Sequence, residues 1–274
     1  MAKALNCSHM NHINAVVEDF DAMVARFDDL YGAQFNMDMP GEHWHACLTT
    51  IGGVMFQFFA PLQYILSARM GPYYVGIEYV VPDVEEARQE VGKRGLRIVR
   101  ELGPAFHMHP DGAHGVAWEF FNLSFQDRQN PPVPYPEPIW EDETFANQPM
   151  GWLGLKRFSM VVADLAAGSD FATGFLGATP LYEEDRPAAA ATAKGFQLGD
   201  TVLELLCPTG EGEIKTFLAR YGDGIRSTVF KVKSLEAAKA HLATKGVTLR
   251  AGDAPGALAI APEDNAGLIF EFSE

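Results

Sequence analysis

The sequence has few cysteines, no long apolar run and no apolar stretch near its first residue. Its three cysteines, Cys7, Cys47 and Cys207, are far apart and show no Cys-x-x-Cys spacing. An odd, scattered set of thiols predicts a reducing compartment and no disulfide framework. No apolar run approaches the roughly 18 residues of a membrane span, and the opening residues lack a secretory signal. We therefore expect a soluble, cytoplasmic protein with no membrane partner.

Basic residues are also scarce. The chain has 21 Lys and Arg against 36 Asp and Glu, which gives a formal net charge of −15. Phosphate recognition needs a basic surface, so this charge argues against nucleic acid and anionic lipid as partners. A small-molecule substrate remains the expected partner. With 274 residues, of which 47% are apolar, the chain can bury one large core or two ordinary ones.

One pattern occurs four times along the chain: a strand, a polar helix cap, an amphipathic helix and a terminal glycine. In its first copy, Asp19 is the expected helix N-cap and Gly32 the expected helix end. Strand and hairpin patterns follow each copy, and the Gly52-Gly53 pair is expected at a tight hairpin turn. The four copies begin at His12, Gly76, Arg157 and Ser227. This arrangement predicts an internal repeat of βαβββ units.

A proline-rich, acidic segment, NPPVPYPEPIWEDETFANQP, separates the second copy from the third. Prolines cannot donate to a strand ladder and favour an extended chain, so this segment reads as a linker. Units with one helix and three or four strands must pair to bury both faces of their sheet. We expect an α+β fold in which the four βαβββ units pair into two curved-sheet, half-barrel domains. The expected boundaries are residues 1–126, a linker at 127–150, and residues 151–274.

Five segments resemble the vicinal oxygen chelate superfamily, which includes glyoxalase I, bleomycin-resistance proteins, extradiol dioxygenases and methylmalonyl-CoA epimerase. They are HINAVVEDFDAM, GIEYVVPDVEEA, PDGAHGVAWEFF, FQLGDTVLELLCP and AGLIFEF. The resemblance extends over nearly the whole chain apart from the linker and the first few residues. It implies the paired βαβββ fold, but it leaves isomerase, lyase, dioxygenase and metal-free binding functions open.

The resemblance also implies where metal ligands lie: at the first residue of each unit's opening strand and near the middle of its last strand, with two units per site. In the N-terminal half these positions are His12, Gln57, Gly76 and Glu119. In the C-terminal half they are Arg157, Glu204, Ser227 and Glu271. The separations within the four pairs are 45, 43, 47 and 44 residues, as a repeated unit predicts.

The two halves then differ in chemistry. An imidazole, an amide and a carboxylate from His12, Gln57 and Glu119 suit one divalent ion: Zn, Fe, Mn, Co or Ni. Arg157 and Ser227 make the C-terminal half a poor metal site, and its two glutamates are expected to pair with Arg157. Gly76 has no side chain to coordinate a metal. Because strand side chains alternate, Glu78 lies on the same face as Gly76 and offers a substitute.

Two hairpins offer further polar groups. If Gln57 lies opposite a residue near Cys47, His45 shares the face of Gln57. If Glu119 lies opposite the FHMH segment, His107 or His109 faces the same cavity. A slip of one residue in either hairpin would move these side chains to the other face.

The leading functional hypothesis is a metal-dependent lyase or isomerase of a small oxygenated substrate. A divalent ion at His12, Gln57 and Glu119 would act as Lewis acid and stabilise an enolate-like intermediate. Glu78, His45 or His107 is the candidate base that removes a proton alpha to a carbonyl.

Two alternatives stay open. One is an extradiol ring-cleaving dioxygenase, in which a second histidine completes a two-His-one-carboxylate Fe(II) site. The other is a metal-free small-molecule binding or sequestration protein of the bleomycin-resistance type. In each case the C-terminal half is expected to pack against the first, to close over its pocket, or to form a homodimer.

Overall fold

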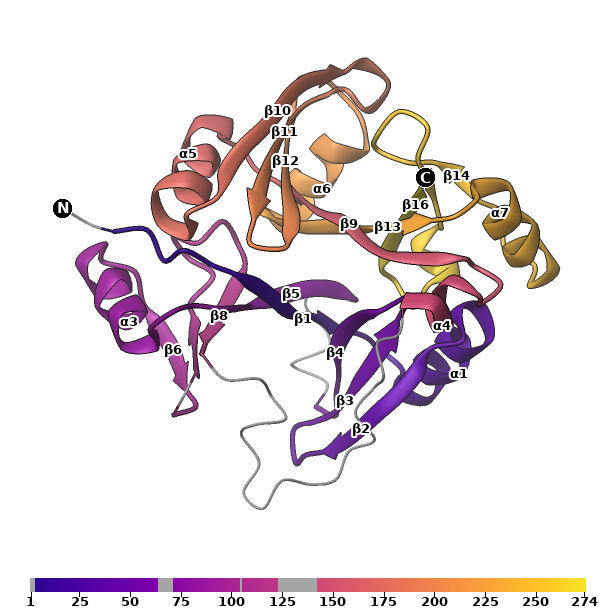
Figure 1. Ribbon diagram of the computed structural model, residues 1–274, viewed down its shortest axis with the longest axis horizontal. Coiled ribbons are helices and arrows are strands. Elements are labelled where there is room, and N and C mark those ends of the chain that lie inside the picture. Colours follow the sequence, from indigo (N-terminus) through magenta and orange to yellow (C-terminus); the bar gives the residue numbers. More distant parts are fainter. Residues whose placement is uncertain (1–2, 64–70, 104, 123–141) are drawn as a thin grey trace. The chain divides into compact units, whose positions relative to one another are not determined.

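Four modules of one helix and four strands follow one another along the chain (Figure 1). The computed structural model describes residues 3–63, 71–103, 105–122 and 142–274. The first module is β1 (His9–Val16), α1 (Phe20–Tyr31), β2 (Gln34–Pro40), β3 (Trp44–Ile51) and β4 (Val54–Pro61). The second is β5 (Tyr73–Val80), α3 (Val84–Lys93), β6 (Ile98–Glu101), β7 (Ala105–Met108) and β8 (Ala117–Phe121).

The C-terminal half repeats this order. The third module is β9 (Trp152–Val161), α5 (Leu165–Asp170) with the π-helical turn Phe171–Leu176, β10 (Thr179–Arg186), β11 (Ala191–Leu198) and β12 (Thr201–Pro208). The fourth is β13 (Gly224–Val232), α7 (Leu235–Thr244), β14 (Arg250–Ala251), β15 (Leu258–Ala259) and β16 (Ile269–Ser273). Two further helices, α4 (Asp142–Ala146) and α6 (Glu213–Tyr221), precede the third and fourth modules. The expected α+β fold of four βαβββ units is confirmed.

The local signals of the repeat lie where the sequence predicts them. Asp19 caps α1 by accepting a hydrogen bond from the Ala22 amide, and Gly32 ends the helix at a φ of 62°. Gly52 and Gly53 join β3 to β4 with φ of 56° and 82°. Two consecutive positive φ angles define the type I′ turn that a two-residue hairpin favours.

The strands of the described residues form two sheets of eight, one from each half of the chain. The N-terminal sheet has the strand order β2-β3-β4-β1-β5-β8-β7-β6, and the C-terminal sheet has the order β10-β11-β12-β9-β13-β16-β15-β14. The opening strand of each module pairs in parallel with its last strand, as β1 does with β4 and β5 with β8. Each sheet therefore contains two modules.

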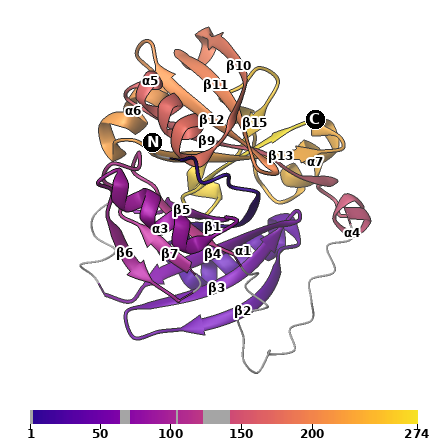
Figure 2. The same cartoon turned by 60° about the vertical axis from the view of Figure 1, so that its left-hand side comes forward.

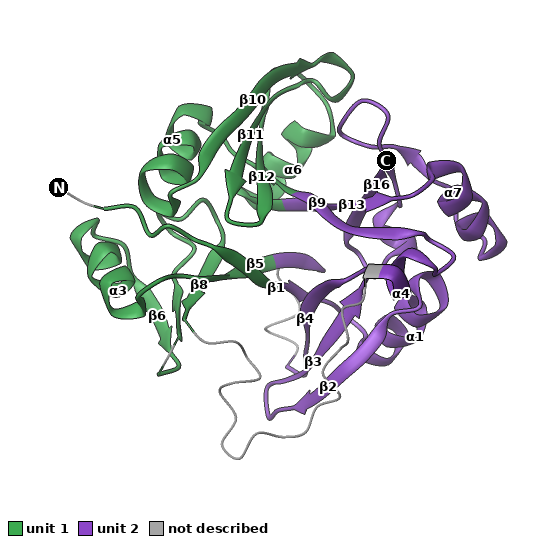
Figure 3. Cartoon of the chain, in the orientation of Figure 1, with its two compact units in different colours: residues 1–12, 75–135, 158–225 green, residues 13–74, 136–157, 226–274 purple. Residues whose placement is uncertain are grey.

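The chain forms two compact units, and these do not coincide with its N-terminal and C-terminal halves (Figure 3). Unit 1 takes residues 1–12, 75–135 and 158–225, whereas unit 2 takes residues 13–74, 136–157 and 226–274. Unit 1 thus combines the second and third modules, and unit 2 combines the first and fourth. The domain boundaries expected from the sequence stay a prediction. Within the expected linker, residues 127–141 lie outside the described residues and α4 begins at Asp142.

The core of unit 1 joins aromatic side chains of the second and third modules. Trp118 on β8 contacts Phe158 of β9 and Phe171, with ring centroids 6.4 and 5.9 Å apart. Phe120 on the same strand meets Phe175 edge-on at 6.2 Å. Four of these five rings are buried, and Phe171 is partly exposed. Burying such large apolar areas is the main force that holds the two modules together.

The core of unit 2 is built in the same way from the first and fourth modules. Phe27 and Tyr31, one turn apart on α1, lie 5.7 and 5.6 Å from the Phe270 ring of β16. Phe56 of β4 and Phe230 of β13 contact the same ring at 5.6 and 5.2 Å. Throughout the described part of the chain, every helix is too short or too polar to cross a bilayer.

Candidate metal centre

Three ionisable side chains converge on one face of the N-terminal sheet in unit 1. His12 lies on β1, Glu78 on β5 and Glu119 on β8, and these strands are successive neighbours in the sheet. Glu78 and Glu119 are direct partners in the parallel β5–β8 ladder. Nδ1 of His12 lies 3.6 Å from Oε1 of Glu78. One ligand atom from each of the three residues lies within 4.8 Å of the other two. We call these residues the His12–Glu78–Glu119 cluster.

The cluster is almost completely shielded from solvent, with 3%, 1% and 3% of the three residues exposed. Two adjacent carboxylates repel one another, and removal of each from water costs several kcal/mol. Hydrogen bonds, a shared proton or positive charge beside it can offset this cost for a buried pair of carboxylates. The cluster therefore has the charge and donor types that suit a bound cation.

His107 adjoins the cluster from the next strand. It is the direct partner of Glu119 in the antiparallel β7–β8 ladder, and its Nε2 lies 3.3 Å from Glu119 Oε2. Its side chain keeps 17% of its surface exposed. The expectation that the FHMH segment lies opposite Glu119 is confirmed, and His107 is the histidine at that position. His109 lies beyond β7, where its Nδ1 accepts a hydrogen bond from the Asp111 amide.

Asn11 contacts the His12 ring and was not anticipated from the sequence. The Asn11 Oδ1 lies 2.9 Å from the His12 Nδ1. Because an amide oxygen can only accept, this contact favours the tautomer with the proton on Nδ1 and a lone pair on Nε2. Metal-ligating histidines are commonly oriented in this way. The only sequence signal was an amide residue directly before the expected ligand.

Position 76 has no room for any residue larger than glycine. A Cβ built on Gly76 would lie 2.2 Å from the carbonyl oxygen of Ala117 on β8. No side chain fits where the strands approach this closely, so a ligand cannot arise at that position. The carboxylate of Glu78, two residues later on the same face, joins the cluster instead, in agreement with the predicted alternation.

Gln57 lies in unit 2, where β4 pairs it with Asn14 on β1 and with Leu48 on β3. Its Nε2 makes a weak contact of 3.9 Å with the Met39 sulfur. The His12–Glu78–Glu119 cluster forms within unit 1 without it. The assignment of Gln57 as a metal ligand stays a prediction.

The face expected for His45 is wrong. Gln57 is opposite Leu48, one residue beyond Cys47, and His45 is opposite Ala60. Because side chains alternate along a strand, His45 and Gln57 point to opposite faces. In unit 2, His45 contacts Asp38 through Nε2 at 2.5 Å and stacks on Phe20 with ring centroids 3.6 Å apart.

In the C-terminal half, Arg186 binds Glu204, which the sequence did not indicate; the expected pairing with Arg157 stays a prediction. The Arg186 guanidinium binds both carboxylate oxygens of Glu204, with Nη1 3.0 Å from Oε1. Ser159 Oγ and Tyr182 Oη donate at 2.8 and 2.7 Å. These donors surround a carboxylate that is fully buried. Nothing in the sequence pattern marks Arg186, because it lies on β10 and reaches Glu204 across β11.

Glu271, the other C-terminal glutamate, is held within unit 2. Ser227 Oγ donates to its Oε1 at 2.7 Å, and the Asp253 amide donates to its Oε2 at 3.0 Å. Burial and the charge of Asp253 raise the pKa of Glu271, while the positive charge of Arg157 opposes this change. Both C-terminal glutamates thus accept hydrogen bonds within their own units, and the expectation of a poor metal site there stays a prediction.

The residues of the His12–Glu78–Glu119 cluster fit a divalent ion. At metal–ligand distances of about 2.0–2.2 Å, ligands of one ion lie no more than about 4.4 Å apart. The separations of up to 4.8 Å in the cluster need only a small closure to reach that range. One nitrogen and two carboxylate oxygens suit Zn, Mn, Fe or Co.

Comparison with known proteins supports the fold at two levels. Residues 154–272 match the family model of the Glyoxalase/Bleomycin resistance protein/Dioxygenase superfamily. Curated proteins give no significant match. Among solved structures, a mutant of 4-hydroxymandelate synthase from Streptomyces coelicolor is similar with a TM-score of 0.72 and 12% identity, over 97% of this chain and 92% of that one.

Two further solved structures illustrate the range of the likeness. The Mn(II)-bound glyoxalase from Novosphingobium aromaticivorans is similar with a TM-score of 0.65 and 14% identity, over 97% of this chain and 82% of that one. Methylmalonyl-CoA epimerase from Mycobacterium tuberculosis has 26% identity over 44% of this chain and 87% of its own, with a TM-score of 0.42. The resemblance inferred from the sequence is confirmed for residues 154–272, which form a glyoxalase/bleomycin resistance/dioxygenase superfamily domain. Over 97% of the chain, the fold is shared with the 4-hydroxymandelate synthase and the glyoxalase.

Proposed function

We propose that this chain is a metal-dependent lyase or isomerase of a small oxygenated substrate, with its metal at the His12–Glu78–Glu119 cluster. The observation that carries the proposal is the approach of three buried ligand atoms to within 4.8 Å of one another. Two of these atoms come from adjacent carboxylates, which is a costly arrangement without a cation. The fold supports the proposal, since a solved glyoxalase of similar fold is bound to Mn(II).

Each of the three residues would contribute a different property to the metal centre. His12 supplies a nitrogen oriented by Asn11, while Glu78 and Glu119 supply carboxylate oxygens whose charge balances a divalent ion. When bound, the ion would act as a Lewis acid toward negative charge that develops on a substrate oxygen. Three protein ligands leave coordination positions for substrate.

His107 is the group that we assign as general base. It lies beside Glu119, and its partial exposure lets it exchange protons with solvent. A neutral imidazole nitrogen can accept a proton, which suits removal of a proton alpha to a carbonyl and its return at a different atom. Glu119, on the opposite strand, fixes the position of this ring.

The decisive experiment is elemental analysis of the purified protein, with His12→Ala and Glu78→Gln as test variants and His45→Ala as control. We expect about one equivalent of a divalent metal in the wild type and the control, and loss of metal in the test variants. Proton exchange at the alpha carbon of small oxo acids, followed by NMR in D2O, reports turnover. Full turnover after exhaustive chelation, or metal retained by both test variants, would contradict the proposal.

One observation favours a second candidate, an extradiol dioxygenase. His107 lies beside Glu119, so His12, His107 and one carboxylate together contain the donor types of a two-His-one-carboxylate iron site. This candidate requires iron in the purified protein and oxygen uptake with catechols. Proton exchange without oxygen uptake would instead support the lyase or isomerase.

A further inference from the structure

The contacts of the second module with its helix α3 show which of its strand side chains point toward α3 and which point to the opposite face. Arg88 on α3 donates to Glu101 at 2.9 Å, and its guanidinium lies 5.4 Å from the centre of the Phe106 ring. Glu101 of β6 and Phe106 of β7 therefore face α3, which lies beside this part of the sheet (Figure 2). Because side chains alternate, Arg100 and His107 face the opposite side, and they are direct partners in the β6–β7 ladder.

Arg100 therefore lies in line with Glu78 and Glu119 across neighbouring strands of the sheet. Three successive ladder pairs connect Arg100 to His107, His107 to Glu119, and Glu119 to Glu78. Paired residues on neighbouring strands lie on one face, and adjacent strands are about 4.8 Å apart. The strand of Arg100 is thus roughly 10 Å from that of Glu119. A small molecule that contacts the cluster at one end can reach the guanidinium at the other.

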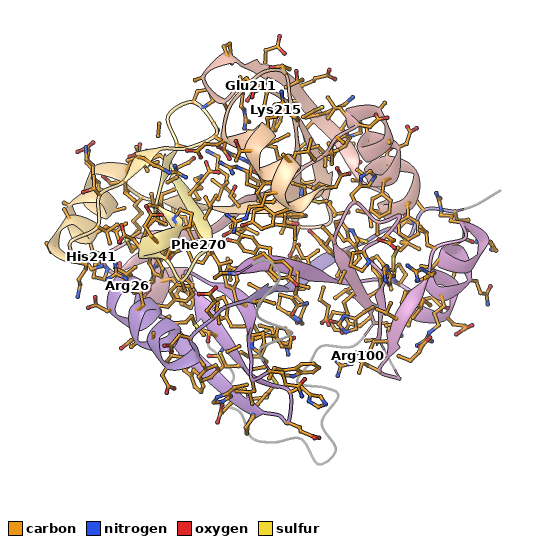
Figure 4. The ribbon with its side chains drawn as sticks, turned by 180° about the vertical axis from the view of Figure 1, so that it is seen from behind. Arg26, Arg100, Glu211, Lys215, His241 and Phe270 are labelled. Atoms are coloured by element: carbon orange, nitrogen blue, oxygen red, sulfur yellow. The ribbon has the colours of Figure 1, made fainter. Side chains whose placement is uncertain are left out.

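The guanidinium of Arg100 is available for a ligand. Arg88 and Arg97 bind carboxylates, and Arg94 binds the Gly174 carbonyl oxygen. Among the described residues, Arg100 is the arginine of this module with neither a hydrogen-bond nor an ion-pair partner. It is exposed, and Figure 4 shows its side chain at the end of β6, directed away from α3.

We propose that Arg100 binds the anionic group of the substrate, so that the enzyme acts on a small oxygenated carboxylate or phosphate. This inference rests on the proposed function and names its substrate class. A guanidinium presents a planar fork of donors that matches two oxygens of either anion. In a chain of net charge −15, an anion needs such a local positive group to bind. His107 then lies between the anchored group and the cluster, next to the bond that loses its proton.

The test compares two anions and four proteins by titration calorimetry on the Mn(II)-loaded protein. The anions are pyruvate and inorganic phosphate, which separate the two possible groups. The proteins are the wild type, Arg100→Gln, Arg100→Lys and the control Arg97→Gln, which removes the same charge from the same module. We expect Arg100→Gln to weaken binding of the preferred anion about 10- to 100-fold. Arg100→Lys should fall between, because it keeps the charge and loses the fork.

The control is expected to stay within about twofold of the wild type. Equal losses in Arg97→Gln and Arg100→Gln would overturn the assignment, because they would reflect net charge alone. No loss in Arg100→Gln would also overturn it, as would failure of both anions to bind the wild type. Thermal unfolding verifies that each variant is folded.

Failure of this inference is distinguishable from failure of the proposed function. Mn(II) affinity, measured by electron paramagnetic resonance, should be the same in Arg100→Gln and wild type, since Arg100 lies outside the cluster. If the wild type binds Mn(II) but Arg100→Gln leaves anion affinity unchanged, the result supports the metal centre and refutes the anion site at Arg100. If the wild type binds no Mn(II), the proposed function falls, and the same titrations on metal-free protein still decide the role of Arg100.

Discussion

Glu78 and Glu119 lie directly opposite one another on adjacent parallel strands, and both are almost completely buried. Carboxylates in such a position are stabilised by positive charge, by hydrogen bonds or by a shared proton. His12 and His107 approach the pair from its two sides, at 3.6 and 3.3 Å. The stability of this part of the sheet should therefore depend on what cation occupies the cluster.

Metal removal is expected to destabilise the protein. A ligand that binds only the folded state adds about 2.7 kcal/mol to the free energy of unfolding at a concentration of 100 times its Kd. Thermal unfolding with chelator and with added Mn(II) or Zn(II) measures this change. The increase should disappear in Glu78→Gln, and a metal-induced increase that persists in that variant would place the ion elsewhere.

Asn11→Ala should weaken metal binding by roughly 10- to 100-fold, because the residue that orients a ligating histidine contributes about that much. Asn11→Asp keeps an oxygen acceptor for Nδ1 of His12 and should restore most of the affinity. Competition with a chromogenic chelator gives both constants. Equal affinities in wild type and Asn11→Ala would show that the contact of 2.9 Å does not position the ring.

Gly76→Ala should destabilise the fold without affecting any ligand directly. Its Cβ would lie 2.2 Å from the Ala117 carbonyl oxygen, and the strands must separate to admit it. We expect a loss of about 1–3 kcal/mol or more in the free energy of unfolding, measured with urea. Gly92→Ala is a suitable control, because nothing lies within 4 Å of a Cβ at that helical position. An unchanged midpoint for Gly76→Ala would refute the steric explanation.

Arg186→Met should cost about 3–5 kcal/mol, because it breaks the ion pair that Arg186 makes with both oxygens of the buried Glu204 carboxylate. The double variant Arg186→Met with Glu204→Leu removes the charge as well and should recover most of the loss. Urea unfolding of the single and double variants gives the coupling between the two residues. Independent, additive losses would show that Arg186 does not act through Glu204.

His9 and Asp200 form an ion pair in unit 1 that should make stability depend on pH. The hydrogen bond to Asp200 raises the pKa of His9 above 6.5. Burial raises the pKa of Asp200, but the hydrogen bonds from His9 and the Met10 amide, together with the charge of His9, outweigh it and lower that pKa below 3.8. The stabilisation from His9 is therefore fully present below pH 6.5 and disappears as pH rises through its raised pKa.

At acid pH the contribution of Asp200 is lost as pH falls through its lowered pKa. Since His9 is largely exposed, the effect should not exceed roughly 1 kcal/mol. Unfolding midpoints of wild type and Asp200→Asn, measured from pH 4 to 9, test it. The two proteins should differ most near pH 5–6, and a constant difference across the range would exclude the titration of His9 as its cause.

The local part of the fold could be read from the sequence because its signals act over a few residues. Asp19 and Gly32 set the ends of α1, and Gly52-Gly53 sets the β3–β4 turn, through backbone geometry that neighbouring residues determine. The face of Glu78 followed from strand alternation, and the position of His107, with His109 as alternative, followed from the expected pairing of the FHMH segment with Glu119. The sequence thus indicated which residues share a face with Glu119, but not how closely they approach it.

Interactions between distant strands were harder to predict. Gln57 is opposite Leu48, three residues from His45, so that His45 points to the other face; a register one residue different would have put both on one face. Arg186 was missed because it reaches Glu204 across an intervening strand. Asn11 was missed because its contact depends on the rotamer of the neighbouring His12 ring.

By itself the sequence determined the repeated module, its helix caps and turns, and the residue types that chemistry at one face requires. Only the tertiary structure decided the close β5–β8 approach at Gly76, the convergence of His12, Glu78 and Glu119, and the grouping of modules into units. The physical reason is that caps and turns are short-range backbone choices. Strand register and side-chain convergence instead depend on contacts between residues far apart in the chain, whose energies are settled together when the sheet forms.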